Sequence, residues 1–376
     1  MVYLDYSATT PINEEVLDTY VKVSKEYIGN PNSLHLLGVR SKNIIDLSTK
    51  QIKEILKVPN HEVIYTSGAS ESNNLALKGI AFEYKNRGNH IITTPLEHSS
   101  IVAPLNFLAK QGFEIDIVNL NEDGTVNINH LKELINDKTI LVSISAVDSE
   151  IGIRQNIEEI SKIVKNNPKC FFHVDATQAI GKVNINYEDV DLISFSAHKF
   201  FGPKGIGVLL KKENIVIQSQ IQGGNSTTKY RSGTPATPLI VSIAKALRLC
   251  NQNLEDKINE IKKLNSIIRS KLSSYNNVHI NSTDKSIPHI LNFSVTKIKP
   301  ETFLHALEEK NIFISTKSAC SKNNSKSNSV MAVTKNEDYA NYSLRISLSY
   351  LTTIEEINYF LEKFDECYNS LLFKGE

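Results

Sequence analysis

The sequence has few cysteines, almost no net charge and no long apolar run. Its 42 Lys and Arg side chains are balanced by 41 Asp and Glu side chains, which leaves a formal net charge of +1. A chain without a charge excess has no bulk attraction to nucleic acid or membrane surfaces, so we expect neither as a direct partner. No apolar run approaches about 18 residues and no charged-then-apolar leader follows Met1, so the cytoplasm is the expected location.

The four cysteines stand far apart, at Cys170, Cys250, Cys320 and Cys367. None of them forms the close pair that zinc sites and redox motifs use, so no metal site is expected. Cys170 opens an apolar strand pattern, while Cys250 and Cys367 lie in helical patterns. These three are therefore predicted to be small buried hydrophobic residues.

Cys320 differs from the other three because it lies in the least apolar segment of the chain, SACSKNNSKSNS at 318–329. This segment has neither a helical nor a strand period and is predicted to be a loop. A cysteine in an exposed polar loop is a candidate for reactivity, and Lys317 and Lys322 are close enough in sequence to favour its thiolate. An incidental surface thiol is the alternative.

At 376 residues the chain is long enough for one large and one smaller domain. Strand and helix patterns alternate between about residues 60 and 210, which predicts an α/β fold with a mainly parallel sheet covered by helices on both faces. The C-terminal part mixes strand-like and helix-like runs and is typical of an α+β unit. We expect a large domain over 12–250 and a smaller one from 1–11 and 251–376.

The strongest local pattern surrounds Lys199. An apolar run that ends at Phe195 is followed by SAHK, and a second apolar run begins at Ile206 after GPKG. A lysine beside apolar surface loses its charge easily, and a neutral amine can form a Schiff base with an aldehyde. The ordinary alternative is a solvated surface lysine. Earlier in the chain, the aromatic strand FFHVD ends in Asp175, and pyridoxal phosphate enzymes pair such a carboxylate with the cofactor's pyridinium nitrogen.

HVDATQ at 173–178 followed by SFSAHKFFGPKGIG at 194–207 strongly resembles the NifS-like cysteine desulfurases, which belong to the class V aminotransferase family. The resemblance extends from LDYSATTP near the start to SLRISLSYLTT near the end. It implies a large domain that binds pyridoxal 5′-phosphate on a mainly parallel seven-stranded sheet flanked by helices. It also implies removal of sulfur from L-cysteine to give L-alanine and a persulfide on Cys320. An acceptor protein would take that sulfur for iron–sulfur cluster assembly or tRNA thiolation.

The resemblance assigns roles to the residues of the cofactor site. Lys199 binds the cofactor, Asp175 keeps its ring nitrogen protonated, Gln178 bonds its ring oxygen, and His98 stacks on the ring and assists proton transfer. The stretch SGASESNN at 67–74 matches the family's phosphate-binding turn, since free N–H groups at a helix start favour an anion; a simple helix cap is the alternative. The expected cofactor contacts are Ala69, Ser70, His98, Ser149, Asp175, Gln178, Ser196, His198 and Lys199, with Thr234 reaching the phosphate in the neighbouring subunit of a homodimer.

The resemblance also assigns the residues that handle the substrate. Arg345 in SLRIS matches the arginine that binds the amino-acid carboxylate, a role that suits a planar guanidinium. Asn30 in the NPNSLH loop and Ser149 are further substrate-binding candidates. STKSAC at 315–320 matches the pattern that carries the family's nucleophilic cysteine, so Cys320 joins Lys199 and His98 as a catalytic residue.

Several positions depart from the family pattern. Ala146, Asp148 and Ser149 replace residues of a His-Val-Asn-Asn-Glu motif, and Lys317 replaces a glycine. The Asp148 charge should weaken binding of an anionic substrate unless its side chain is turned away. Two alternatives therefore stand beside a cysteine desulfurase. One is a related enzyme such as a selenocysteine lyase or an aminotransferase, and the other is a scaffold or sulfur-relay homologue with weakened catalysis.

Overall fold

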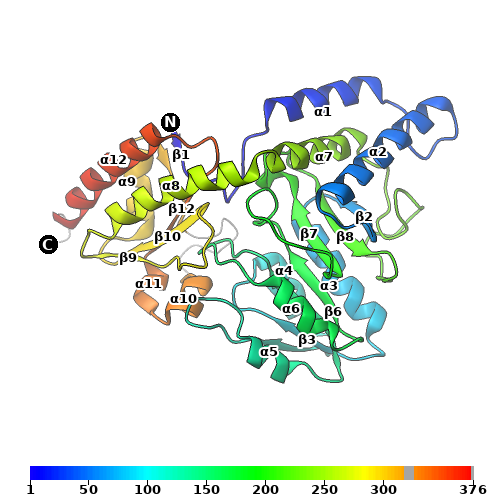
Figure 1. Ribbon diagram of the computed structural model, residues 1–376, viewed down its shortest axis with the longest axis horizontal. Coiled ribbons are helices and arrows are strands. Elements are labelled where there is room, and N and C mark those ends of the chain that lie inside the picture. The colour runs from blue at the N-terminus through cyan, green and yellow to red at the C-terminus, as the bar shows by residue number, and fades with distance from the viewer. Residues whose placement is uncertain (317–325, 374–376) are drawn as a thin grey trace.

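The computed structural model describes residues 1–316 and 326–373, and its larger part is built on a seven-stranded sheet (Figure 1). The strands are, in sheet order, β2 (His61–Thr66), β8 (Gly207–Lys212), β7 (Leu192–Ser196), β6 (Phe171–Asp175), β5 (Thr139–Ser145), β3 (His90–Thr93) and β4 (Glu114–Ile117). Strands β4, β3, β5, β6 and β7 run parallel, while β8 runs antiparallel to β7 and β2. The predicted α/β class with a mainly parallel sheet is therefore confirmed.

Helices cover both faces of this sheet, as its alternating side chains require. They are α1 (Glu14–Glu26), α2 (Leu36–Ile55), α3 (Ala69–Tyr84), α4 (Ser99–Ala109), α5 (Ile128–Leu134), α6 (Ile157–Lys165) and α7 (Thr237–Asn251). In β7, Ile193 and Phe195 pack in the cluster that contains residues of α2, α6 and α7, whereas Leu192 packs in the cluster formed with α3 and α4. Neighbouring residues of one strand thus enter opposite cores.

A second, three-stranded antiparallel sheet lies in the C-terminal part, in the order β12 (Ser343–Ser347), β10 (Ile290–Val295) and β9 (Val278–Ile280). Its helices are α8 (Leu254–Leu272), α9 (Pro300–Glu308) and α12 (Ile354–Phe373), which share a buried apolar cluster with β10 and β12. Two short helices, α10 (Asn328–Thr334) and α11 (Glu337–Asn341), follow the part of the chain that is not described. The proposed boundaries at residues 12 and 250 stay a prediction.

Two connections join the sheets. The first strand, β1 (Val2–Tyr3), pairs in parallel with β11 (Ile312–Phe313), so the N-terminal segment starts beside the C-terminal elements and then crosses to α1 (Figure 1). Helices α7 and α8 make the second connection, and the chain between them turns at Asn253, whose φ of 52° is left-handed. In the described part of the chain, no helix combines the length and apolar character needed to span a bilayer.

Candidate active site

A cavity of about 480 Å³ lies where the carboxyl ends of the parallel strands meet the N-terminal segment and β12. Ser145, Asp175 and Ser196 end three adjacent strands and all line it. Ligands of open α/β sheets bind at this edge because the loops that follow the strands diverge there.

The cavity brings together most of the residues that the sequence singles out. They are Ala69, Ser70, His98, Ser149, Asp175, Gln178, Ser196, His198, Lys199 and Arg345. Asn30 does not line it: this residue is exposed, and its Oδ1 accepts a hydrogen bond of 3.0 Å from the Asn32 backbone. Thr234 is also exposed and lines a separate pocket of about 100 Å³, which shares Ser67 and Gly205 with the cavity. Cys320 lies outside the described residues, as does Lys317.

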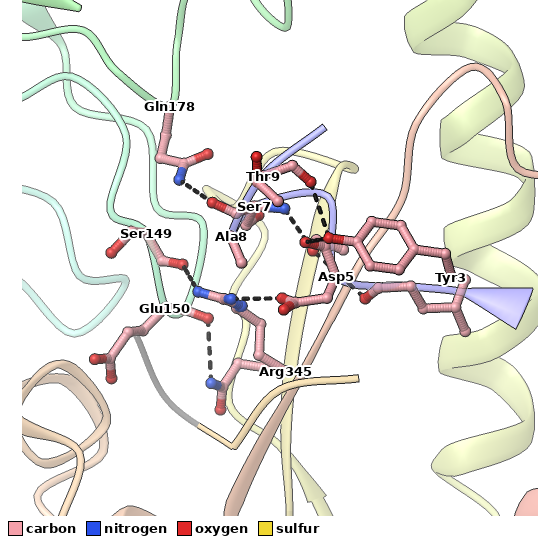
Figure 2. A network of polar contacts seen from close by, with 12 residues as sticks. Tyr3, Asp5, Ser7, Ala8, Thr9, Ser149, Glu150, Gln178 and Arg345 are labelled. Carbon is pink, nitrogen blue, oxygen red and sulfur yellow. Dashed lines mark hydrogen bonds and ion pairs between the residues drawn. The ribbon is translucent and has the colours of Figure 1, made fainter. Parts of the chain in front are cut away.

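Lys199 follows β7 on a single 3₁₀ turn, Ala197–Lys199, and its amine faces the N-terminal segment. Nζ donates to the carbonyl oxygens of Ser7 at 2.6 Å and Ala8 at 2.8 Å. The Ser7 oxygen also accepts a bond of 3.0 Å from Gln178 Nε2, as Figure 2 shows. Lys182 Nζ donates to the other end of the same amide, Oε1, at 2.5 Å. Since the Ser7 carbonyl oxygen only accepts, its contact fixes Gln178 with the N–H group toward Ser7 and with Oε1 toward Lys182.

Asp175 ends β6 and is almost completely buried, with 5% of its surface exposed. Its Oδ1 accepts a bond of 2.9 Å from the Thr177 backbone, and its Oδ2 accepts one of 2.8 Å from Asn73 Nδ2. These two donors fix the carboxylate at the end of β6, where it lines the cavity and can pair with a cationic group of a ligand.

His98 caps α4 and lines the cavity, with its Nδ1 turned toward the helix. Nδ1 accepts from the Ser100 backbone at 3.1 Å and lies 2.8 Å from Ser100 Oγ. Ser100 Oγ in turn accepts a bond of 2.9 Å from Asn73 Nδ2. Neither Asn73 nor Ser100 is among the residues predicted from the sequence, although Asn73 lies within SGASESNN and Ser100 follows His98 by two residues.

The start of α3 supplies an anion-binding surface. Its capping residue, Gly68, makes no side-chain cap bond, so the first N–H groups of α3 are left for a ligand. The chain packs closely here, because a Cβ added to Gly207 would lie 2.6 Å from Gly68 Cα. Nearby, burial and the charges of Lys199 and Lys204 lower the pKa of His198 to about 4, so this imidazole is neutral at physiological pH.

Arg345 reaches the cavity from β12 and is 1% exposed. Nη2 forms an ion pair of 2.7 Å with Asp5 Oδ1, and Nη1 donates to the Ser149 carbonyl oxygen at 2.8 Å (Figure 2). Nε is buried without a hydrogen-bond partner among the described residues. Arg345 contacts the backbone carbonyl of Ser149, so this hydrogen bond does not depend on the serine side chain that replaces the family's asparagine.

Asp148 is turned away from the cavity and does not line it. Its Oδ2 accepts from the backbone N–H groups of Glu150, Ile151 and Gly152 at 3.1, 2.5 and 3.3 Å, and its Oδ1 accepts from Ser329 Oγ at 2.9 Å. Burial, and then repulsion from Glu150, raise its pKa to about 6. The charge expected to oppose an anionic substrate is therefore directed into a turn and toward α10.

The described residues contain no cluster of three or more His, Cys, Asp or Glu side chains that could hold a metal ion. The polar groups around the cavity instead match an organic ligand with an anionic group. They combine a free helix start, a buried carboxylate, a lysine amine and an arginine.

Comparisons with known proteins agree with this geometry. Residues 2–360 match the family model described as aminotransferase class-V. The protein "Cysteine desulfurase IscS" of Buchnera aphidicola subsp. Baizongia pistaciae is 40% identical over 380 residues, which cover 98% of this chain and 93% of that protein.

Solved structures show the same fold. One named "NIFS-LIKE PROTEIN" is 34% identical with a TM-score of 0.93 and covers 98% of this chain and 100% of its own. Another, "SspA in complex with cysteine", is 30% identical with a TM-score of 0.82 and covers 94% of this chain and 100% of its own. The chain therefore belongs to the class-V aminotransferase family, among its NifS-like members.

Proposed function

We propose that this protein is a pyridoxal-phosphate-dependent cysteine desulfurase. The observation that carries the proposal is the convergence of Lys199, Asp175 and Arg345 on one cavity from three separate elements. An amine, an anion and a guanidinium placed together are what a cofactor enzyme acting on an amino acid needs.

The cavity fits pyridoxal 5′-phosphate. The uncapped start of α3, with Ser70, Ser196 and His198 around it, would hold the phosphate. Asp175 would pair with the ring nitrogen, and the N–H group of Gln178 would face the ring oxygen. When bound, the cofactor supplies a reactive aldehyde and an electron-accepting ring.

The chain's own groups then bind and move the substrate's atoms. Arg345 binds the carboxylate of L-cysteine, and Lys199 Nζ takes the proton from its Cα. Cys320, as thiolate, forms a bond to the substrate sulfur while the substrate's Cβ–S bond breaks. The substrate thiol gives up its proton and Cβ receives one, while Lys199 returns a proton to Cα. L-alanine leaves, and the sulfur stays on Cys320 as a persulfide.

The persulfide would pass to an acceptor protein, for iron–sulfur cluster assembly or tRNA thiolation in the cytoplasm. We also propose a homodimer in which Thr234 contacts the phosphate bound by the other subunit. The exposure of Thr234 and its position in a pocket next to the cavity support this arrangement. The assignment of Asn30 to substrate binding has no such support within one chain, because its side chain is outside the cavity.

Alanine formation from L-cysteine by the purified protein with pyridoxal phosphate tests the proposal. We expect stoichiometric alanine and sulfur transfer, and Lys199→Ala should lose both together with the visible absorption band of the bound cofactor. Absence of alanine from the wild-type protein would favour a sulfur-relay homologue. Unchanged sulfide release by Cys320→Ser would favour a lyase that needs no persulfide.

A further inference from the structure

We propose that Asn73 and Ser100 are positioning residues that hold His98 as a neutral imidazole with its ring proton on Nε2. A chain of hydrogen bonds leads from Asp175 through Asn73 and Ser100 to His98. The proposal rests on the proposed function only for the ligand group that His98 would meet in the cavity.

The buried carboxylate of Asp175 sets the orientation of Asn73. Asn73 is fully buried, and its amide lies 2.8 Å from Asp175 Oδ2. A carbonyl oxygen at that distance would repel the carboxylate, so Nδ2 must face it. In this orientation Asn73 Oδ1 is buried without a partner among the described residues. A buried unpaired acceptor is destabilising, so its presence indicates that the contact with Asp175 determines the orientation.

The orientation of Asn73 then sets the hydroxyl of Ser100. The second Nδ2 hydrogen of Asn73 points to Ser100 Oγ at 2.9 Å, so this oxygen accepts there. The remaining partner of Ser100 Oγ in the described structure is His98 Nδ1, at 2.8 Å. The hydroxyl hydrogen is therefore directed to Nδ1.

The imidazole receives a second donor on the same nitrogen. The Ser100 backbone N–H lies 3.1 Å from Nδ1 and cannot accept. A proton on Nδ1 would face both donors, so the neutral ring must carry its proton on Nε2. Burial lowers the pKa of His98, Lys199 lowers it further, and the carboxylates of Asp175 and Glu150 oppose this shift.

The tautomer of His98 determines which proton transfers this residue can make in the cavity. A neutral imidazole with its proton on Nε2 donates a hydrogen bond there but cannot accept a proton at that atom. His98 therefore acts as a donor and a flat contact surface, and proton movement at the substrate falls to Lys199. This refines the expectation that His98 assists proton transfer.

Ring-nitrogen NMR of the full chain labelled with ¹⁵N-histidine tests the inference, with His98→Gln to assign the signals. We expect the His98 signals of an unprotonated Nδ1 and a protonated Nε2, without titration around 6.5, where an ordinary histidine changes charge. A proton on Nδ1, or a doubly protonated ring at neutral pH, would overturn the proposal. Because this readout needs no turnover, it is independent of whether the desulfurase assignment holds.

Three variants test the positioning residues. Ser100→Ala should raise the pKa of His98, since one of the two donors to Nδ1 is lost, whereas Ser99→Ala should leave it unchanged because Ser99 is exposed one residue away. Asn73→Ala should also raise it, but should add nothing in the Ser100→Ala background, because Asn73 acts through Ser100. An identical His98 titration in Ser100→Ala and Ser99→Ala would refute the role of Ser100, even if Asn73→Ala did not fold.

Discussion

Arg345 Nη2 lies 2.7 Å from Asp5 Oδ1, although 340 residues separate the two in sequence. The pair ties the N-terminal segment to β12 at the wall of the cavity (Figure 2). Because Arg345 is buried while Asp5 is partly exposed, the guanidinium keeps a fixed position from which Nη1 also reaches the Ser149 carbonyl. We infer that the arginine is held ready for a substrate carboxylate.

Arg345→Lys should raise the KM for L-cysteine about 10- to 100-fold. A lysine cannot reproduce the planar donor pair, and hydrogen bonds to charged groups contribute about 1.5–3 kcal/mol. Steady-state alanine formation measures the effect. Arg269→Lys is a matched control, since Arg269 is a partly buried arginine bonded to Asn265 on α8 and does not line the cavity. Equal KM values for the two variants would contradict the assignment.

Asp148→Asn should stabilise the protein at high pH more than at low pH. The pKa of Asp148 is raised from 3.8 to about 6 by burial and by Glu150, so the folded state binds this proton more tightly than the unfolded chain. The free energy of unfolding therefore decreases as pH rises from 3.8 to about 6, because the folded protein must give up the Asp148 proton. Above pH 6 the full cost of the buried carboxylate, on the order of 3 kcal/mol, destabilises the fold. Asparagine does not titrate, so it avoids this cost.

Thermal unfolding at pH 4.5 and pH 8 measures that difference. The Tm of Asp148→Asn relative to wild type should be higher at pH 8 than at pH 4.5, while Asp46→Asn, at an exposed position on α2, should show no such difference. The same Tm difference between Asp148→Asn and wild type at pH 4.5 and at pH 8 would show that burial does not raise the pKa of Asp148.

Alkylation of the native protein with iodoacetamide should modify Cys320 and leave the other cysteines unmodified. Cys170, Cys250 and Cys367 are buried, and burial raises the pKa of each thiol, to about 12 for Cys250. A thiol reacts as its thiolate, so these three cysteines are protected both by burial from the reagent and by the small fraction of thiolate at neutral pH. Peptide mass spectrometry reads the result, with denatured protein as the control in which all four react. Rapid labelling of Cys250 in the folded protein would disprove this.

Gly207→Ala should lower cofactor content and stability. The added Cβ would lie 2.6 Å from the backbone of Gly68, so the start of α3 would have to shift. Overpacking of this kind costs about 1–3 kcal/mol. Gly224→Ala is the matched control, because a Cβ there meets no atom within 4 Å. Bound pyridoxal phosphate, measured after gel filtration, should fall only in the first variant, and full retention would exclude the proposed phosphate site.

Hydrophobic periodicity predicts a long amphipathic helix over 38–56 and one long or broken helix over 238–275. In the structure the first is α2, at Leu36–Ile55, and the second is α7 and α8, separated at Asn253. The antiparallel direction of β8 cannot be predicted from hydrophobic periodicity, since an apolar run has the same pattern in both directions. The length of the connection between β7 and β8 does indicate it, because a parallel crossover needs about a dozen residues or more and this connection is shorter.

The site was predictable where chemistry and motif coincide in one residue, as in Lys199, Asp175 and Arg345. Asn73 and Ser100 could not be predicted as site residues, because their role depends on a contact between two helices, α3 and α4, and no local sequence pattern indicates such a contact. The direction of the Asp148 side chain could not be predicted either. It depends on three backbone N–H groups of the following turn and on Ser329, which lies far along the chain.

The most direct test of the central claim is the mass of the Cys320 peptide after the purified protein meets L-cysteine. We predict one added sulfur atom on Cys320 in the wild-type protein, removable by a reductant, and none in Lys199→Ala. Sulfur on Cys320 in the Lys199→Ala protein, or its absence from a wild-type protein that forms alanine, would contradict the proposed persulfide mechanism.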